Sequence, residues 1–185
     1  RGLLHKQGLK VGDHLLLTKP LGTGTLFASH MQLKADGRHV QLAVETMLQS
    51  NAKAGELAVQ HGASAGTDVT GFGLLGHLLE MLAAGQAAKL SLSAIPRLAG
   101  AIEGIRAGVF STMHGANAAA KEAIDGTSSG LEPEVVDLLL TTTPKWSQGG
   151  INQLAIGLMQ ILSWIQDITR LKKVRWMHLD KLPKT

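Results

Sequence analysis

Residues 66–81 read Gly-Thr-Asp-Val-Thr-Gly-Phe-Gly-Leu-Leu-Gly-His-Leu-Leu-Glu-Met and place one carboxylate, Asp68, just before a glycine-rich turn that opens a helix. Glycines at positions 71, 73 and 76 permit a tight turn and a close approach of the backbone to other groups. The amide groups at the start of a helix lack partners within the helix and attract oxyanions. An acid beside such a turn therefore indicates a site for a metal ion and a phosphate group.

The same turn also satisfies the dinucleotide-binding pattern GxGxxG, from Gly71 to Gly76. That pattern requires an acidic residue about 20 positions further on, where it holds a ribose hydroxyl. The next acid after Glu80 is Glu103, which lies beyond the segment that would form the next strand. NAD binding is therefore disfavoured, whereas a purely structural role of the glycines, in a turn and in close helix packing, stays open.

Residues 67–77, Thr-Asp-Val-Thr-Gly-Phe-Gly-Leu-Leu-Gly-His, resemble the signature of selenophosphate synthetase (selenide, water dikinase), where it lies in the carboxy-terminal domain. Two flanking segments are similar to the same family. They are residues 8–24, which include Lys-Pro-Leu-Gly-Thr-Gly, and residues 108–117, which begin Gly-Val-Phe-Ser-Thr-Met-His and end at Asn117. The three segments together cover about residues 8–125 in the family's order and spacing.

The resemblance implies an α/β (α+β) fold, the AIR-synthetase-type carboxy-terminal domain with a mixed sheet flanked by helices, here over residues 1–150. For the intact enzyme it implies that ATP, selenide and water give selenophosphate, AMP and phosphate. It also implies Mg²⁺ on the polyphosphate, Asp68 as a metal ligand assisted by acids from another domain, and a homodimer. A carboxylate suits this role because Mg²⁺ prefers oxygen ligands.

The family's reactive Cys or selenocysteine, its partner Lys and most nucleotide ligands belong to an amino-terminal domain. We expect that domain to be missing here, because the chain begins with Arg1 only about a dozen residues before the similar segment, and because it contains no cysteine. No catalytic residue is assigned, and the chain alone is expected to be inactive. The alternative is a noncatalytic remnant, or an interaction domain that pairs with a separate amino-terminal half.

Residues 151–185 are expected to form a divergent or frameshifted basic tail. Where the family would show Asp-Pro-Gln-Thr-Ser-Gly-Gly-Leu-Leu, residues 143–151 read Thr-Pro-Lys-Trp-Ser-Gln-Gly-Gly-Ile. A shift of reading frame at about residues 141–150 and a genuinely divergent end are both compatible with this sequence. If the tail is out of register, the sheet loses its last strand and exposes an edge.

Charge and hydropathy exclude several classes of protein. The chain has 185 residues, 44% of them hydrophobic and 17% charged, and a net charge of +4. Six basic residues and one acid follow residue 169, whereas the rest has 12 basic and 13 acidic residues. The nearly neutral charge of residues 1–169 argues against a nucleic-acid-binding surface on the folded domain. The alternative that the basic residues after 169 tether the chain to nucleic acid or another anionic surface stays open. The longest apolar stretch, 154–165, is too short to span a membrane, and a cytoplasmic location is expected.

Apolar spacing predicts the elements that hold Asp68. Strands are predicted at 14–18 and 67–70 and helices at 26–34, 39–60 and 73–84, with Gly62 ending the second helix. These place Asp68 at a strand end, on the side to which the following helix points its amino terminus. Further on, the pattern predicts strands at 90–93 and 135–140 and helices at 96–107 and 117–124.

Two histidines, His77 and His114, are candidates for a functional role. His77 lies three positions before Glu80, so the two can share a helix face, but a packing or capping role is favoured over metal ligation because no second cluster supports it. His114 follows Ser111 closely and precedes Asn117. A Ser–His pair without a third, orienting group is weak evidence for a nucleophile, so His114 and Asn117 stay unassigned.

Overall fold

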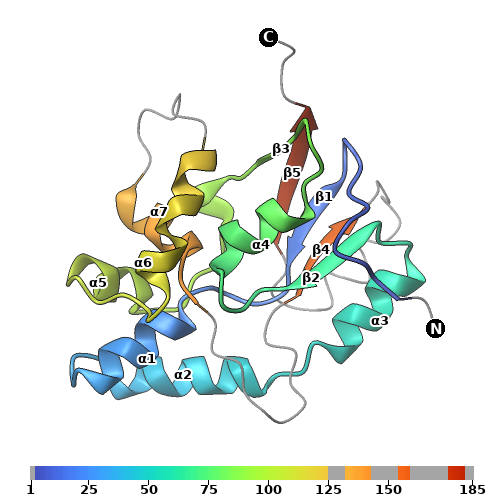
Figure 1. Ribbon diagram of the computed structural model, residues 1–185. Helices are drawn as coiled ribbons and strands as arrows, with labels where there is room; N and C mark the ends of the chain where they lie inside the picture. Colours follow the sequence, from blue (N-terminus) through green and yellow to red (C-terminus); the bar gives the residue numbers. More distant parts are fainter. Residues whose placement is uncertain (1–2, 125–131, 143–153, 159–174, 182–185) are drawn as a thin grey trace.

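The computed structural model describes residues 3–124, 132–142, 154–158 and 175–181, and Figure 1 shows their arrangement. A five-stranded sheet has the order β2-β4-β1-β5-β3. Its strands are β1 (His14–Leu17), β2 (Ala65–Asp68), β3 (Gln86–Lys89), β4 (Leu154–Leu158) and β5 (Arg175–Lys181). β1 lies at the centre, and its three leucines are almost completely buried, as expected for a short, continuous apolar strand.

The four ladders of the described strands are all antiparallel, so the mixed sheet expected from the sequence is not what these strands form. β4 pairs with both β1 and β2, and β5 pairs with both β1 and β3. Two strands within residues 151–185 therefore belong to the sheet. Most of the segment proposed for the frame change, 143–150, lies outside the described residues.

Seven α-helices and two 3₁₀ helices are present in the described part of the chain. The α-helices are α1 (Thr23–Met31), α2 (Gly37–Leu48), α3 (Ala52–Gln60), α4 (Gly73–Met81), α5 (Ala101–Arg106), α6 (His114–Asn117) and α7 (Pro133–Leu139). The 3₁₀ helices are η1 (Leu92–Ala94) and η2 (Ala118–Ala123). Figure 1 shows five of these helices gathered beside one end of the sheet, namely α1, α2, α5, α6 and α7. α3 contacts β4, and α4 follows β2 in the chain.

The predicted helix over 39–60 is two helices, because the chain turns at residues 49–51. Asn51 is buried there, and its side-chain oxygen accepts a hydrogen bond from Thr18 Oγ1 at 3.0 Å. The Ser50 hydroxyl accepts one from the amide of Ala52 at 3.1 Å. Polar side chains that bond the nearby backbone compete with a continuous helix. Gly62 has a φ of 72° just after α3, as predicted for the residue that ends this helix.

The predicted strand at 135–140 is wrong, since residues 135–139 belong to α7 and Leu140 caps this helix. Pro133 lies in its first turn, where its fixed φ suits a helix start. Val135, Leu138 and Leu139 are buried at helical spacing. The run of apolar residues alone did not distinguish a buried helix from a strand.

Three further predicted elements differ from the structure. The strand expected at 90–93 lies earlier, at β3, and η1 follows it. The helix expected from Pro96 begins only at Ala101, because Pro96 and Leu98 exchange backbone hydrogen bonds with Leu21. The helix expected at 117–124 is a 3₁₀ helix over most of this range.

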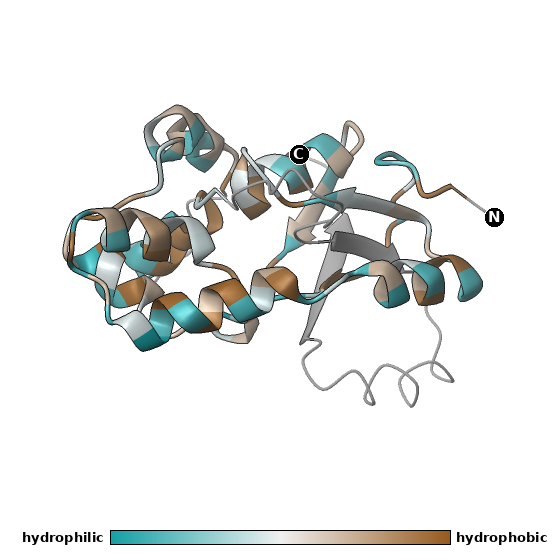
Figure 2. Cartoon of the chain, turned by 90° about the horizontal axis from the view of Figure 1, so that it is seen from below, coloured by the Kyte–Doolittle hydropathy of each residue, from teal (hydrophilic) through white to brown (hydrophobic). Residues whose placement is uncertain are grey.

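A cluster of buried apolar side chains joins β1, β2, α1, α4, α5 and α7. Seen from below, polar and apolar bands alternate along the helices (Figure 2), and α2 and α3 carry the exposed apolar residues Val44, Leu48 and Val59. Among the described residues, no helix has the length and apolar character needed to cross a membrane.

Candidate functional site

Asp68 is the last residue of β2 and is half-buried, between the buried side chains of Thr67 and Val69. Its Oδ2 atom lies 3.5 Å from the hydroxyl oxygen of Thr70. Within the described ranges no Lys, Arg or His forms an ion pair with this carboxylate. The predicted position at a strand end, just before α4, is confirmed.

The glycines of the turn have different roles. Gly73 has a φ of 69°, and a Cβ atom on it would lie 2.5 Å from the carbonyl oxygen of Leu139. A Cβ atom on Gly76 would lie 2.7 Å from the Cβ of Phe72. Gly73 and Gly76 are therefore required by close packing within the protein. A Cβ on Gly71 would meet nothing within 4 Å, so protein packing does not explain this glycine.

Asn117 holds the turn from the other side. This buried side chain donates hydrogen bonds to the carbonyl oxygens of Gly71, at 2.9 Å, and Leu140, at 3.0 Å. The hydroxyl of Thr142 donates a further hydrogen bond to the Gly71 carbonyl at 3.2 Å. The sequence left Asn117 unassigned, and no local pattern indicates that a residue of α6 would reach a turn 46 positions earlier. Its role is to fix the backbone beside Asp68.

Behind the turn, a series of hydrogen bonds leads from Asp68 to the amino-terminal segment. Thr70 Oγ1 lies 3.3 Å from His77 Nε2, and His77 Nδ1 lies 3.1 Å from Glu80 Oε2. The same Glu80 oxygen accepts a hydrogen bond from Lys6 Nζ at 2.6 Å. The Lys6 ammonium, through this bond, is the main reason why the pKa of Glu80 lies below its usual value.

His77 itself is buried, with 4% of its surface exposed, and its ring lies beside that of Phe72 with 5.4 Å between centroids. This environment agrees with the packing role favoured from the sequence. In the part of the chain that the structure describes, no three His, Cys, Asp or Glu side chains are grouped to hold a metal ion. A metal ion at Asp68 would thus have only part of its ligands here.

The available atoms fit a hard cation. Asp68 and Thr70 offer oxygen atoms, which Mg²⁺ prefers, and the carboxylate carries a negative charge that no described basic side chain neutralises by direct contact. The amide of Gly73 is less available to an oxyanion than the sequence suggested, because it donates to the Thr70 carbonyl at 3.2 Å.

His114 lies in a separate polar cluster. Its Nε2 is 3.4 Å from Asp137 Oδ1, which also accepts a hydrogen bond from Lys121 at 2.5 Å. Its ring stacks on Phe110 with 4.2 Å between centroids. Burial lowers the pKa of His114, although the Asp137 charge acts in the opposite direction.

The hydroxyl of Ser111, which lies near His114 in the sequence, bonds a different residue. Its hydroxyl oxygen accepts a hydrogen bond from the amide of Thr142 at 3.1 Å and lies 3.4 Å from the Thr142 hydroxyl. This pairing fixes the chain after α7. It gives no support to a Ser–His nucleophile.

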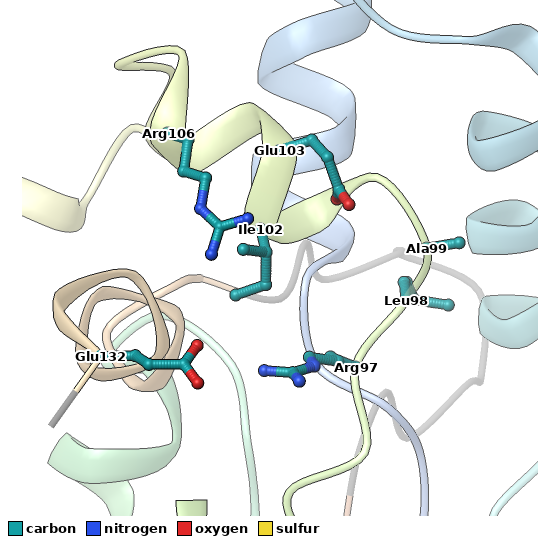
Figure 3. A pocket seen from close by; sticks show the side chains of 7 residues that line it. All are labelled: Arg97, Leu98, Ala99, Ile102, Glu103, Arg106 and Glu132. Carbon is teal, nitrogen blue, oxygen red and sulfur yellow. The ribbon is translucent and has the colours of Figure 1, made fainter. Parts of the chain in front are cut away.

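A surface pocket of about 310 Å³ lies at the start of α5 and α7. Figure 3 shows the guanidinium groups of Arg97 and Arg106 and the carboxylate of Glu132 directed toward this space, which Leu98 and Ile102 also line. Arg106 Nε is already paired with Glu134 Oε1 at 3.1 Å. None of the residues that line the pocket belongs to the turn beside Asp68. No motif in the sequence indicates this pocket.

Comparison with family models matches residues 10–122 to the AIR synthase related protein, C-terminal domain. The chain belongs to this family. Among AIR synthase related relatives, the selenide, water dikinase of Burkholderia cenocepacia is 40% identical over 157 residues, which are 80% of this chain and 43% of that protein. The enzyme of the same name from Bdellovibrio bacteriovorus is 40% identical over 129 residues, 68% of this chain and 36% of that protein. The chain thus spans less than half the length of these relatives, and the resemblance found in the sequence is confirmed.

Two solved structures share the fold of this chain. Thiamine-monophosphate kinase from Stenotrophomonas maltophilia K279a superposes with a TM-score of 0.59 at 15% identity, covering 97% of this chain and 51% of that one. The E. coli hydrogenase maturation protein HypE gives a TM-score of 0.51 at 18% identity, covering 97% and 47%. At these identities the likeness concerns the fold alone.

Proposed function

We propose that this chain is the carboxy-terminal part of an ATP-dependent selenophosphate synthetase, in which Asp68 supplies one ligand of the Mg²⁺ that holds the polyphosphate of ATP. The observation that supports this most is a carboxylate at the end of β2 with no basic partner in direct contact among the described residues. It lies in a sequence 40% identical to selenide, water dikinases. The bound Mg²⁺ would spread the negative charge that develops on the phosphoryl oxygens.

The chain's own residues contribute positioning. β2 fixes the backbone of Asp68, and Asn117 and Thr142 hold the carbonyl of Gly71, so the turn keeps its shape when a ligand approaches. Gly71 has no side chain, and the space that a Cβ atom would occupy is open, so the turn beside Asp68 stays accessible there. A protein group that is already held in place before the metal ion binds loses less conformational entropy on binding, so it binds the ion more tightly than a mobile group would.

The reaction needs groups that the described residues do not provide. ATP, selenide and water give selenophosphate, AMP and phosphate, so both anhydride bonds of ATP are cleaved. The chain has no cysteine to act on selenide, and a single carboxylate holds a divalent cation weakly. We propose that the remaining ligands and the nucleophile come from the part of the enzyme that this chain does not match. The chain alone is then inactive.

A chimera tests this function. In the enzyme of Burkholderia cenocepacia, residues 10–122 of this chain, which match the family model, replace the corresponding domain. Phosphorus NMR then follows the formation of selenophosphate and AMP from ATP and selenide. We expect the chimera to be active. Loss of a residue that only hydrogen-bonds a metal ligand typically costs about 10–100-fold in activity. Asp68→Asn removes a ligand itself, so it should lower the activity of the chimera by more than this. The matched control is Glu103→Gln, an exposed acid outside the turn, which should leave activity unchanged.

Two results would overturn the proposal. One is a chimera that folds but has no activity. If this chain then still binds the separate amino-terminal half of the enzyme, the result favours a noncatalytic interaction domain. The other is full activity of the Asp68→Asn chimera. Selenide-dependent ATP cleavage by the 185-residue chain alone would contradict the shared site.

A further inference from the structure

We propose that the pocket at the start of α5 and α7 binds a small zwitterion, an α-amino acid, whose carboxylate contacts Arg97 and Arg106 and whose ammonium group contacts Glu132. The proposed function does not use this pocket, so neither depends on the other. The volume of about 310 Å³ lies at the lower end of the range of ligand pockets, roughly 300–1,000 Å³, and therefore suits a small molecule.

The backbone of Arg97 is fixed on both sides by hydrogen bonds to Leu21. The amide of Leu21 donates to the carbonyl of Pro96 at 2.8 Å, and the amide of Leu98 donates to the carbonyl of Leu21 at 2.9 Å. In the described part of the chain the guanidinium of Arg97 makes no ion pair, and Figure 3 shows it directed into the pocket. Its N–H donors are therefore available to a ligand.

The second cationic group, that of Arg106, is positioned by α7. Its Nε atom donates to Glu134 Oε1 at 3.1 Å, which leaves the donors of both terminal nitrogens for other partners. Figure 3 shows this guanidinium directed toward the same space as that of Arg97. A guanidinium can donate two parallel hydrogen bonds to a carboxylate, so a pair of them favours an anion of this planar kind.

Glu132 adds a negative charge to the same space. It directly precedes the first turn of α7, but its side chain does not cap this helix. It also forms no ion pair with any residue that the structure describes, and Figure 3 shows its carboxylate directed into the pocket. A carboxylate only accepts hydrogen bonds, so the partner of Glu132 must be a donor, such as an ammonium group.

The balance of charge decides the class of ligand. Two arginines and two glutamates, Glu103 and Glu132, line the pocket, so its lining is neutral overall. Phosphate would meet the arginines but would also lie beside the carboxylate of Glu132, and the contact between like charges disfavours binding. An α-amino acid carries a carboxylate and an ammonium group on one carbon atom and satisfies both signs. The pocket offers an aliphatic side chain apolar contacts with Leu98, Ala99 and Ile102.

Titration of the 185-residue chain with leucine, followed by NMR, tests the proposal. Leucine should shift the amide signals of residues 97–106. Two analogues each lack one of its charged groups, since isocaproate has no ammonium group and isoamylamine has no carboxylate. We expect both analogues, and also inorganic phosphate, to bind about tenfold more weakly than leucine or worse, because each leaves a charged group of the pocket unpaired.

Variants identify the groups that hold leucine. Arg97→Gln should weaken the binding of leucine and of isocaproate about tenfold or more. Glu132→Gln should weaken the binding of leucine but leave that of isocaproate unchanged or tighter. Lys53→Gln, which removes a positive charge from α3, is the control and should change neither. All three positions are exposed, and circular dichroism confirms that each variant is folded.

Three results would overturn the proposal. Leucine that leaves the signals of residues 97–106 unshifted, or that binds Arg97→Gln as tightly as the wild type, would show that it does not occupy this pocket. Isocaproate or phosphate that binds the wild type as tightly as leucine would show a site for simple anions instead. None of these results bears on the proposed function, which is tested by the activity of the Asp68→Asn chimera.

Discussion

Asn117 donates its side-chain amide to the carbonyl oxygen of Gly71 at 2.9 Å, although 46 positions separate the two residues. The second hydrogen of the same amide reaches the carbonyl of Leu140 at 3.0 Å. One buried side chain therefore ties the turn beside Asp68 to the end of α7. This contact acts together with the hydrogen bond from Thr142 to the Gly71 carbonyl and the one from the Gly73 amide to the Thr70 carbonyl, which also fix the turn.

Asn117→Ala should lower the free energy of unfolding by about 1–3 kcal/mol, because the buried carbonyl of Leu140 and the partly buried carbonyl of Gly71 each lose a donor. Urea denaturation measures this change. The control Glu122→Ala, at a neighbouring exposed position, should change stability by less than about 0.5 kcal/mol. Equal stability of the two variants would show that the Asn117 contacts contribute nothing net.

Gly73→Ala should destabilise the protein by at least about 2 kcal/mol, because the added Cβ would meet Leu139 and because φ is positive. Gly37→Ala is the matched control, since a Cβ at the start of α2 meets nothing within 4 Å. The control should be neutral or stabilising by up to about 1 kcal/mol. Thermal unfolding of both variants checks the contrast, and a Gly73→Ala protein as stable as the wild type would refute the packing role.

The sequence predicted those elements whose local pattern and tertiary environment agree. β1, α4 and the position of Asp68 follow from an apolar run, a helical repeat and a glycine turn. It failed for α7, where a buried apolar run fits either a helix or a strand. It also failed at Asn51, where a distant hydrogen bond from Thr18 accompanies a break in the expected helix.

Of the candidate site, only the acidic residue Asp68 could be predicted from the sequence. Asp68 lies where the glycine turn indicated, but its surroundings are made by residues far apart in sequence. Asn117 and Lys6 reach the site through tertiary contacts that leave no periodic pattern. The pairing of His77 with Glu80 was visible as a three-residue spacing, but Thr70 was not recognised as its other partner.

Acid should destabilise the protein partly through His114. Burial places its folded-state pKa below the usual 6.5, so the unfolded chain binds the proton more readily. The stabilisation is thus complete above 6.5 and is lost as the pH falls through this value toward the folded-state pKa. Asp137 opposes the shift and Lys121 reinforces it.

His114→Gln should accordingly lose less stability than the wild type when the pH is lowered through this window. Urea denaturation at neutral pH and at a pH below the folded-state pKa measures the difference. The comparison uses the pH dependence of each protein, so a uniform loss of stability in the variant does not obscure it. Equal pH dependence in the two proteins would contradict the assignment.

Lys6→Met should raise the pKa of Glu80 toward its usual value of 4.5, because the hydrogen bond from Lys6 is the largest cause of the present shift. Carboxyl carbon NMR shifts followed through a pH titration measure this value. Lys53→Met serves as the control, since Lys53 pairs with Glu56 instead. A Glu80 pKa that does not move would mean that His77 or another group determines its charge.

The central claim is that Asp68 is a ligand of the cation that carries the nucleotide. Broadening of backbone amide signals by manganese–ATP, compared between the wild type, Asp68→Asn and the control Asp36→Asn, tests it most directly. We predict broadening centred on residues 68–71 that disappears in Asp68→Asn and persists in Asp36→Asn. Broadening of this turn that survives in Asp68→Asn, or signals there that manganese–ATP leaves sharp in the wild type, would contradict the claim.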